Sequence, residues 1–260
     1  MKITVFCWTL VLAGFSLTYS QAGLRTIEAN AFAPGEILKY RIHYGFVDAG
    51  VASIEIKKGV HTLKKRPSWH VVGTGRTKGA FDWFFKVRDR YESYIDTAAI
   101  IPWAFVRRVN EGGYIINQNV TFDHYENTAT SEKGTIHVPE GVQDLVSAYY
   151  YARSIDFTNA GNGQVYQINA YLDDEVFPMN LKFIGREKVK TKLGTFKCLK
   201  FRPMLQEGRV FKEEEDMTIW VSDDANKVVI RAEANILVGS IKMDLSGYSG
   251  LANPFNAKVK

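Results

Sequence analysis

The chain has 260 residues, of which 46% are hydrophobic, 13% aromatic and 23% charged, and its 33 Lys and Arg residues outnumber its 28 Asp and Glu residues. These proportions are typical of a globular protein and exclude a disordered, collagen-like or coiled-coil chain. The length suits one large β domain or two small domains.

Residues 1–22 have the pattern of a secretory signal peptide. Lys2 supplies a positive start, residues 3–17 are mainly apolar, and small residues permit cleavage after Ser20 or after Ala22. The apolar run is too short for a membrane anchor, which needs about 20 residues. We therefore expect an exported, soluble protein of the periplasm or cell envelope, with no transmembrane anchor after cleavage and no nucleic-acid partner.

The number of cysteines indicates a fold that is stable without a disulfide bond. Cleavage would remove Cys7 and leave Cys198 alone, so no internal bridge is expected. Cys198 lies in a segment, residues 196–201, with apolar residues on both faces. This environment favours a buried, inert thiol over a reactive one.

Alternation of apolar and polar residues dominates the chain from residue 37 onward. In residues 37–44, Leu38 and Tyr40 share one face, while Lys39 and Arg41 share the other, which predicts a half-buried strand. The same signal predicts strands at residues 52–56, 69–75, 88–95, 103–109, 114–122, 130–138, 165–172, 176–184, 195–202, 217–221 and 228–245, the last long enough for two strands separated near Gly239.

A single segment, residues 144–154, has helical periodicity. Leu145, Ala148 and Tyr149 begin an apolar stripe at i, i+3 and i+4. Asp144 is placed to accept hydrogen bonds from the free N–H groups at the start, and Arg153 suits the negative end of the helix dipole.

Together these elements predict a mainly β fold. About ten to twelve antiparallel strands would not form a flat sheet, so we expect a curled, barrel-like or half-barrel domain with one short helix. No linker or repeat divides the chain. The expected organisation is a signal peptide over residues 1–22, a single domain over 23–250 and a C-terminal tail over 251–260.

No motif in the sequence indicates catalysis, a metal or a cofactor. Residues 73–79 lack the spacing of a phosphate-binding loop and are more typical of a strand end followed by a turn. No histidine pairs with another at a ligand spacing, so His43, for example, is expected to be solvated. The acidic runs at 173–175 and 213–216 lack calcium-loop spacing. We expect no enzymatic activity, although residues distant in sequence could still form a hydrolase site.

A basic segment between two predicted strands is a candidate contact for an anionic surface. Five cations fall within ten residues: Lys57, Lys58, Lys64, Lys65 and Arg66. In the cell envelope such a cluster would attract phospholipid headgroups or anionic polymers. The alternative is a hairpin tip that is kept soluble by its charge.

Two aromatic groups are candidate contacts for an apolar ligand. They contain Trp83, Phe84 and Phe85, and Tyr149 and Tyr150. Either group could close the mouth of a barrel. The alternative is that they fill the core and supply ordinary surface tyrosines.

Several segments in order resemble a known family. They are Phe32-Ala33-Pro34-Gly35-Glu36, the helix of residues 144–153, the hairpin of residues 185–198 and the strand end Ile219-Trp220-Val221-Ser222-Asp223-Asp224. Over residues 30–248 the chain resembles the bacterial domain-of-unknown-function family 3108, exported β-rich proteins. The resemblance implies an envelope protein but supplies no activity and no catalytic residues.

Two functions remain open on the sequence. The first is non-enzymatic binding of an apolar or amphipathic molecule, such as a lipid, in the concave face of the sheet. The alternative is a structural or assembly factor that docks other envelope proteins through a sheet edge or an exposed patch. A membrane-spanning barrel is disfavoured, because Lys and Arg recur on both faces of later strands such as residues 195–202.

Overall fold

The structure, a computed structural model, describes residues 23–204, 217–236 and 239–259. The signal-peptide prediction therefore concerns residues that lie outside the described ones. Within the described ranges the strands are β1 (Ile37–Tyr44), β2 (Val47–Ile56), β3 (His61–Leu63), β4 (Arg66–Thr77), β5 (Arg88–Asp96), β6 (Pro102–Glu111), β7 (Tyr114–Asp123), β8 (Thr128–Ser131), β9 (Gly134–His137), β10 (Val165–Leu172), β11 (Glu175–Thr191), β12 (Gly194–Met204), β13 (Met217–Ser222), β14 (Val229–Asn235), β15 (Ser240–Ser249) and β16 (Lys258–Val259). The helices are α1 (Gly79–Phe84) and α2 (Leu145–Ser154).

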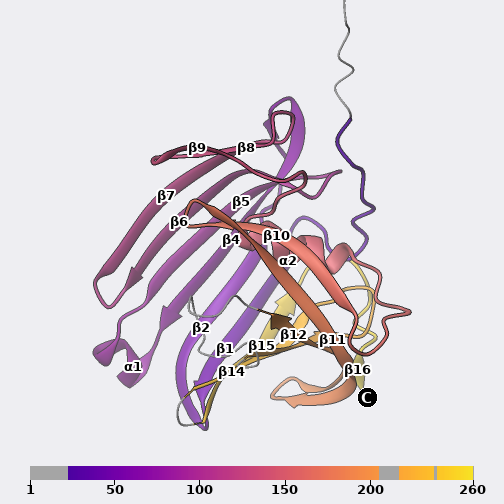
Figure 1. Ribbon diagram of the computed structural model, residues 1–260. Coiled ribbons are helices and arrows are strands. Elements are labelled where there is room, and N and C mark those ends of the chain that lie inside the picture. Colours follow the sequence, from indigo (N-terminus) through magenta and orange to yellow (C-terminus); the bar gives the residue numbers. More distant parts are fainter. Residues whose placement is uncertain (1–22, 205–216, 237–238, 260) are drawn as a thin grey trace, which may run out of the picture.

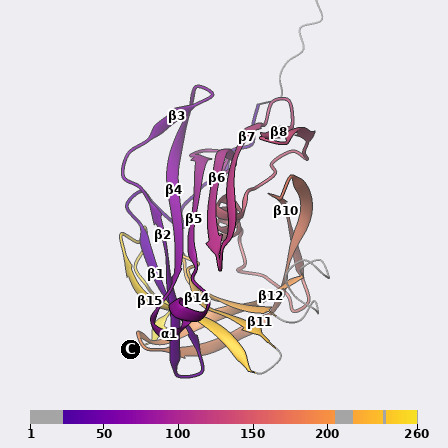
Figure 2. The same cartoon turned by 90° about the vertical axis from the view of Figure 1, so that its left-hand side faces the viewer.

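One antiparallel sheet contains all of these strands. Its order is β10-β11-β12-β13-β14-β15-β1-β2-β4-β5-β6-β7-β8-β9, with β3 paired to β4 and β16 paired to β12. The sheet curls around α2, which lies across its concave side (Figures 1 and 2). No pairing joins the edge strands β9 and β10 among the described residues; instead Gln143, next to α2, exchanges backbone hydrogen bonds with β10. The predicted half-barrel is confirmed, as a sheet that does not close.

The strand and helix counts differ from the prediction. The described residues contain sixteen strands rather than ten to twelve, because β3, β8, β9 and β16 have only two to four residues and show little alternation. The single strand predicted at 130–138 covers the β8–β9 hairpin. Helix α1 was not predicted, since it is six residues long and buries none of them. The predicted separation of two strands near Gly239 is confirmed by β14 and β15.

The last residues of the chain pack on the sheet. Phe255 contacts the rings of Phe196 and Tyr248, and β16 pairs with β12. A Cβ at Gly250 would lie 2.3 Å from the carbonyl oxygen of Gly35, so only glycine lets the chain after β15 pass over the turn before β1. The segment expected as a tail thus contributes to a hydrophobic cluster of the domain.

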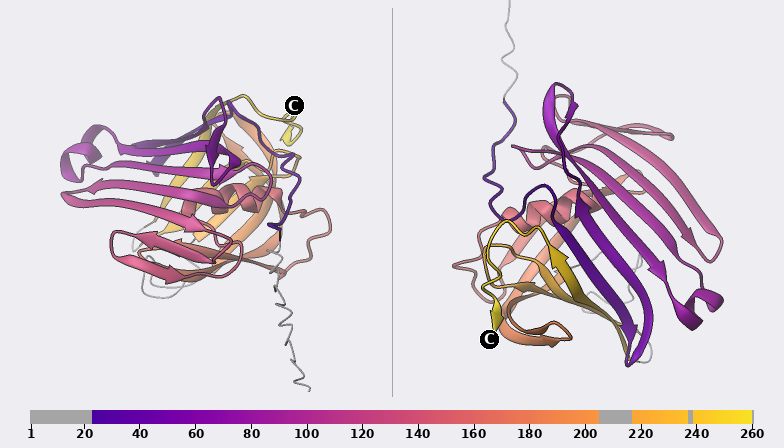
Figure 3. Two further views of the ribbon diagram at one scale, coloured as in Figure 1. Left: turned by 90° about the horizontal axis from the view of Figure 1, so that it is seen from above. Right: turned by 180° about the vertical axis from the view of Figure 1, so that it is seen from behind.

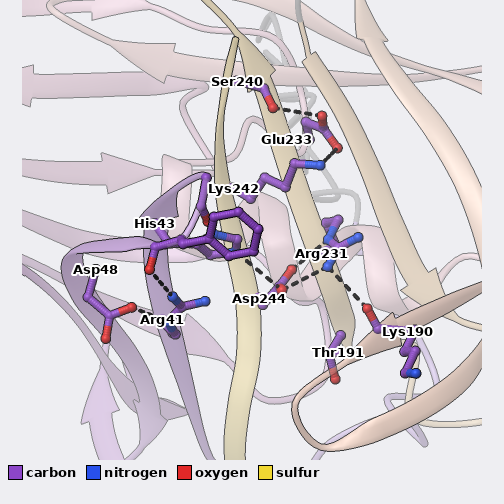
Figure 4. A network of polar contacts seen from close by, with 12 residues as sticks. Arg41, His43, Asp48, Lys190, Thr191, Arg231, Glu233, Ser240, Lys242 and Asp244 are labelled. Atoms are coloured by element: carbon purple, nitrogen blue, oxygen red, sulfur yellow. Dashed lines mark hydrogen bonds and ion pairs between the residues drawn. The ribbon is translucent and has the colours of Figure 1, made fainter.

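Polar contacts link three strands on the face opposite α2 (Figure 4). The Asp244 carboxylate of β15 accepts hydrogen bonds from Arg231 of β14 at 2.6 and 2.8 Å and lies 3.3 Å from Nε2 of His43 of β1. His43 is therefore buried rather than solvated as expected, because its strand neighbours supply a partner. Cys198 is buried as predicted, and burial raises the pKa of its thiol to about 12.

Buried polar groups hold both ends of α2. At its start, Asp144 accepts hydrogen bonds from the backbone N–H groups of Val146 and Ser147 and from the Ser93 hydroxyl of β5. The predicted helix cap is thus confirmed, as a capping box. At the other end, the Arg153 guanidinium donates to both carboxylate oxygens of Glu36, at 2.6 and 2.7 Å.

The Arg153–Glu36 pair has almost no exposure to solvent. Arg153 also donates to the carbonyl oxygens of Ala31 and Asn226, so its hydrogen-bonding capacity is largely satisfied inside the protein. Arg153 was expected only to complement the helix dipole. Its buried pairing with a residue 117 positions away is the stronger constraint on where the helix lies.

We predict that Glu36→Gln lowers the free energy of unfolding by about 3–5 kcal/mol, because it leaves a buried guanidinium without its counter-ion. The matched control is Asp48→Asn, which removes the exposed carboxylate that pairs with Arg41 and should change stability by about 1 kcal/mol or less. Denaturant unfolding of both variants measures the difference. Equal effects would show that the buried pair does not hold the helix.

The raised pKa of the buried Asp144 carboxyl leads us to predict that the stability of the protein depends on pH. Burial raises its pKa to about 6 in the folded protein, although hydrogen bonds from Ser93 and the backbone oppose the shift. The unfolded carboxyl titrates near pH 4, so between about pH 4 and 6 the folded state holds a proton that the unfolded state has lost. Stability from this group is therefore greatest below pH 4 and falls as pH rises to 6.

The test is Asp144→Asn, which keeps an acceptor oxygen for the helix N-terminus but cannot titrate. Relative to this variant, the unaltered protein should lose about 2–3 kcal/mol of unfolding free energy between pH 4 and 7. All other groups titrate in both proteins, so the difference between the two stability curves isolates Asp144. Parallel curves would contradict the assignment.

Candidate ligand cavities

Two apolar cavities flank helix α2 on the concave side of the sheet. The first, of about 380 Å³, lies between α2 and strands β1, β2, β4 and β5. The second, of about 240 Å³, lies between α2 and strands β11, β12 and β13. Both are lined by Leu145, Tyr149 and Val229. The first is somewhat larger, and the second somewhat smaller, than the usual lower limit for small-molecule sites, about 300 Å³.

The first cavity exists because three neighbouring positions on the concave face carry almost no side chain. Ala52 of β2 lies opposite Gly75 of β4, and Gly73 lies two residues along the same strand. A Cβ at Gly75 would meet nothing within 4 Å, and one at Gly73 would make only ordinary contacts at 3.8 Å. Neither glycine has a positive φ, so the backbone does not require glycine at either position. Their effect is to leave room.

The second cavity is lined mainly by side chains that could not bind a polar molecule. Met179, Leu181, Phe201, Ile219 and Val221 form its sheet side. One cation lies at its boundary. Lys227 donates to the Arg153 carbonyl oxygen at 3.1 Å, and burial lowers the pKa of its ammonium group. An apolar cavity with a cation at one boundary suits an amphipathic molecule.

The acidic side chain at the first cavity is Asp89 of β5. Asp89 lines the cavity and accepts a hydrogen bond from the backbone N–H of Asn110 at 3.1 Å. Burial and the neighbouring Asp89 raise the pKa of Glu111. In the part of the chain that the structure describes, no group of three or more His, Cys, Asp or Glu side chains could hold a metal ion.

The predicted aromatic contacts are divided among three places. Tyr149 lines both cavities, whereas the neighbouring Tyr150 is fully buried in the core, and its hydroxyl has no hydrogen-bond partner among the described residues. Trp83, Phe84 and Phe85 lie on and just after α1, exposed at one end of the sheet, and line neither cavity. The structure therefore does not bring the two aromatic groups together.

The basic segment lies at the opposite end of the sheet from α1 (Figures 1 and 2). Three of its cations form ion pairs: Lys57 with Glu55, Lys64 with Asp123, and Arg66 with the buried Asp96. Lys58 and Lys65 form no ion pair with a described residue. Anionic-surface contact by this segment stays a prediction.

The residues that create the first cavity were not among the candidates predicted from the sequence. Gly73 and Gly75 were interpreted as the end of a strand, but both lie inside β4, which continues to Thr77. Glycine in the middle of a strand often marks a site where a ligand or another backbone segment approaches the strand closely. The signal was therefore present, but only the pairing of β4 with β2 shows that Ala52 completes the small-residue patch.

None of the described helices has the length and apolar character needed to cross a membrane. A comparison with curated protein sequences found no match. Among solved structures, a β-barrel-like protein of domain of unknown function DUF1849 from Brucella abortus superposes with a TM-score of 0.55, at 11% identity, covering 87% of this chain and 99% of that one. This likeness confirms a barrel-like fold.

Two further structures match with lower scores. A candidate lipoprotein from Parabacteroides distasonis has a TM-score of 0.39 at 15% identity, covering 86% of this chain and 99% of that one. A candidate exported protein with a YmcC-like fold from Bacteroides fragilis has a TM-score of 0.30 at 12% identity, covering 87% of this chain and all of that one.

A family model for proteins of unknown function, DUF3108, matches residues 39–246, which include every strand from β2 to β14 and both helices. The match spans well over half of the chain and agrees with the segments that first suggested it. The chain belongs to the DUF3108 family.

Proposed function

We propose that this protein is exported to the cell envelope, acts without catalysis, and binds an apolar or amphipathic molecule in the two cavities beside α2. Export rests on the signal-peptide pattern of residues 1–22. The observation that carries the binding proposal is the small-residue patch of Ala52, Gly73 and Gly75, which keeps apolar volume free in the interior.

Empty apolar volume is unfavourable to a fold, because side chains around it lose packing contacts. Larger residues at Gly73 and Gly75 would recover those contacts and suit a strand better than glycine does. Two glycines at these positions are therefore better explained by a ligand that fills the space than by stability. Tyr149 and Leu145, which lie between the cavities, would contact such a ligand from both sides.

The test is the double variant Gly73→Leu, Gly75→Leu, with Thr74→Leu as its matched control. Thr74 lies between the two glycines and borders the first cavity, but its side chain is exposed on the opposite face of the sheet, where its hydroxyl lies 2.9 Å from that of Ser53. Binding is measured by the fluorescence of N-phenyl-1-naphthylamine, an apolar probe. The double variant should weaken binding at least roughly tenfold, since loss of contact with two methylene groups already costs about 1.6 kcal/mol.

Thermal unfolding of each variant is the accompanying control, and both should remain folded. The Thr74→Leu variant should bind the probe as the unaltered protein does. If the double variant also binds with unchanged affinity, the first cavity is not the ligand site. A protein that binds no amphiphile at all would favour the alternative, a factor that docks envelope proteins.

A further inference from the structure

Four connections between strands lie side by side at one end of the sheet. Because neighbouring strands are antiparallel in the order β14-β15-β1-β2-β4-β5-β6-β7, the β14–β15, β1–β2, β4–β5 and β6–β7 connections all fall at the same end. The β1–β2, β4–β5 and β6–β7 connections lie along the lower left border of the molecule in Figure 1 and project together in Figure 3. The β4–β5 connection contains α1.

Most of the exposed large hydrophobic side chains in the described part of the chain lie on these connections or next to them. We name this set the apolar rim; it includes Phe46, Trp83, Phe84, Tyr114, Ile115 and Ile236. Phe46 is fully exposed, and Trp83 and Phe84 are 82% and 76% exposed. Exposed apolar residues gathered on one side of a protein mark an interaction surface.

The apolar side chains of the tip formed by α1 do not contribute to the protein core. The helix buries none of its residues, and the Trp83 and Phe84 rings contact each other edge to face at 4.7 Å. Phe85 packs so closely on Gly112 of the β6–β7 turn that a Cβ there would lie 2.5 Å from its ring. The tip is thus attached to its neighbour while Trp83 and Phe84 face solvent.

Unpaired cations surround this tip. Arg76, Lys78 and Lys86 form no ion pair with any residue that the structure describes, whereas the carboxylate of Asp82 is already paired with Arg88 at 2.6 Å. Across the adjoining strands Arg76 lies opposite Arg88, and Arg90 lies opposite Arg108. Arg88 and Arg90 already have carboxylate partners, Asp82 and Glu92. The cations left for a bound anion to neutralise are therefore Arg76, Lys78 and Lys86.

We propose that the apolar rim docks on an anionic lipid bilayer, with Trp83 and Phe84 in the interfacial layer and Arg76, Lys78 and Lys86 on the phosphates of the headgroups. Tryptophan is favoured at the boundary between hydrocarbon and water, and basic residues beside it are attracted to anionic lipid. Separate apolar tips, each able to enter a fluid layer, suit a bilayer better than one shaped protein partner.

The rim lies where the interior of the sheet opens. A third cavity, of about 530 Å³, is lined by Phe81 of α1 and by Ile236 and Ile241 of the rim, and it shares Gly75 and Asp89 with the first ligand cavity. A molecule docked through the rim would present this opening to the bilayer. A role for this opening in ligand entry rests on the proposed function, whereas docking on the bilayer does not.

The experiment is flotation of the purified protein with vesicles of phosphatidylglycerol and phosphatidylethanolamine, compared with vesicles of phosphatidylcholine. We expect binding to the anionic vesicles that weakens as salt rises. Lipids brominated near the headgroup should quench Trp83, which is 82% exposed, whereas Trp103 and Trp220 are buried and Trp69 is packed against the main core cluster. The signal should disappear in Trp83→Phe, which assigns it.

Matched variants separate the rim from the opposite end of the sheet. Trp83→Ser with Phe84→Ser, and Lys78→Glu with Lys86→Glu, should each weaken vesicle binding roughly tenfold or more. Val60→Ser, at an exposed apolar residue within the basic segment, and Lys58→Glu with Lys65→Glu should weaken vesicle binding much less than the matched rim variants do. Because all these side chains are exposed, circular dichroism should show every variant folded.

Three results would overturn the proposal. They are an absence of binding to anionic vesicles, binding without quenching of Trp83, and loss of binding in Lys58→Glu with Lys65→Glu but not in Lys78→Glu with Lys86→Glu. The last would assign the lipid contact to the basic segment. The Gly73→Leu, Gly75→Leu variant should still bind vesicles, so failure of the ligand proposal and failure of docking are distinguishable.

Discussion

The buried ion pair between Arg153 and Glu36 fixes the position of helix α2, and the interior of the protein is arranged around that helix. Two desolvated charges are stable only together, so the segment before β1 and the end of α2 must meet. Asp144 anchors the other end of the helix to β5 through Ser93. The helix is therefore held by polar contacts at its ends. Between these ends, Leu145 and Tyr149 line the two apolar cavities, one on each side of the helix.

This arrangement explains how a sheet can curl without filling its own interior. The main core cluster, which includes Phe105, Phe122 and Tyr150, lies toward β6 and β7. A second cluster, which includes Phe196 and Trp220, lies toward β12 and β13. Small side chains on β2 and β4 leave volume near the helix. The stable clusters allow the cavities to persist, and the open border of the sheet places the third cavity beside the exposed tips.

The sequence predicted the features that depend on local pattern. Alternation in residues 37–44 identified β1, and Asp144 before an apolar stripe identified the cap of α2. It could not predict features that depend on register. The partner of Arg153 is 117 residues away, and nothing near Arg153 indicates it. The significance of Gly73 and Gly75 appears only when β4 is paired with β2. The rim likewise requires the strand order, since its tips are far apart in the sequence.

The most direct test of the central claim, that the cavities hold an amphipathic molecule, is native mass spectrometry. The protein would be purified without detergent from the organism that produces it, and the bound material would be extracted into organic solvent. We expect a population heavier than the polypeptide by the mass of a lipid or other amphiphile, in stoichiometric amount. A homogeneous polypeptide mass, with no amphiphile in the extract, would contradict it.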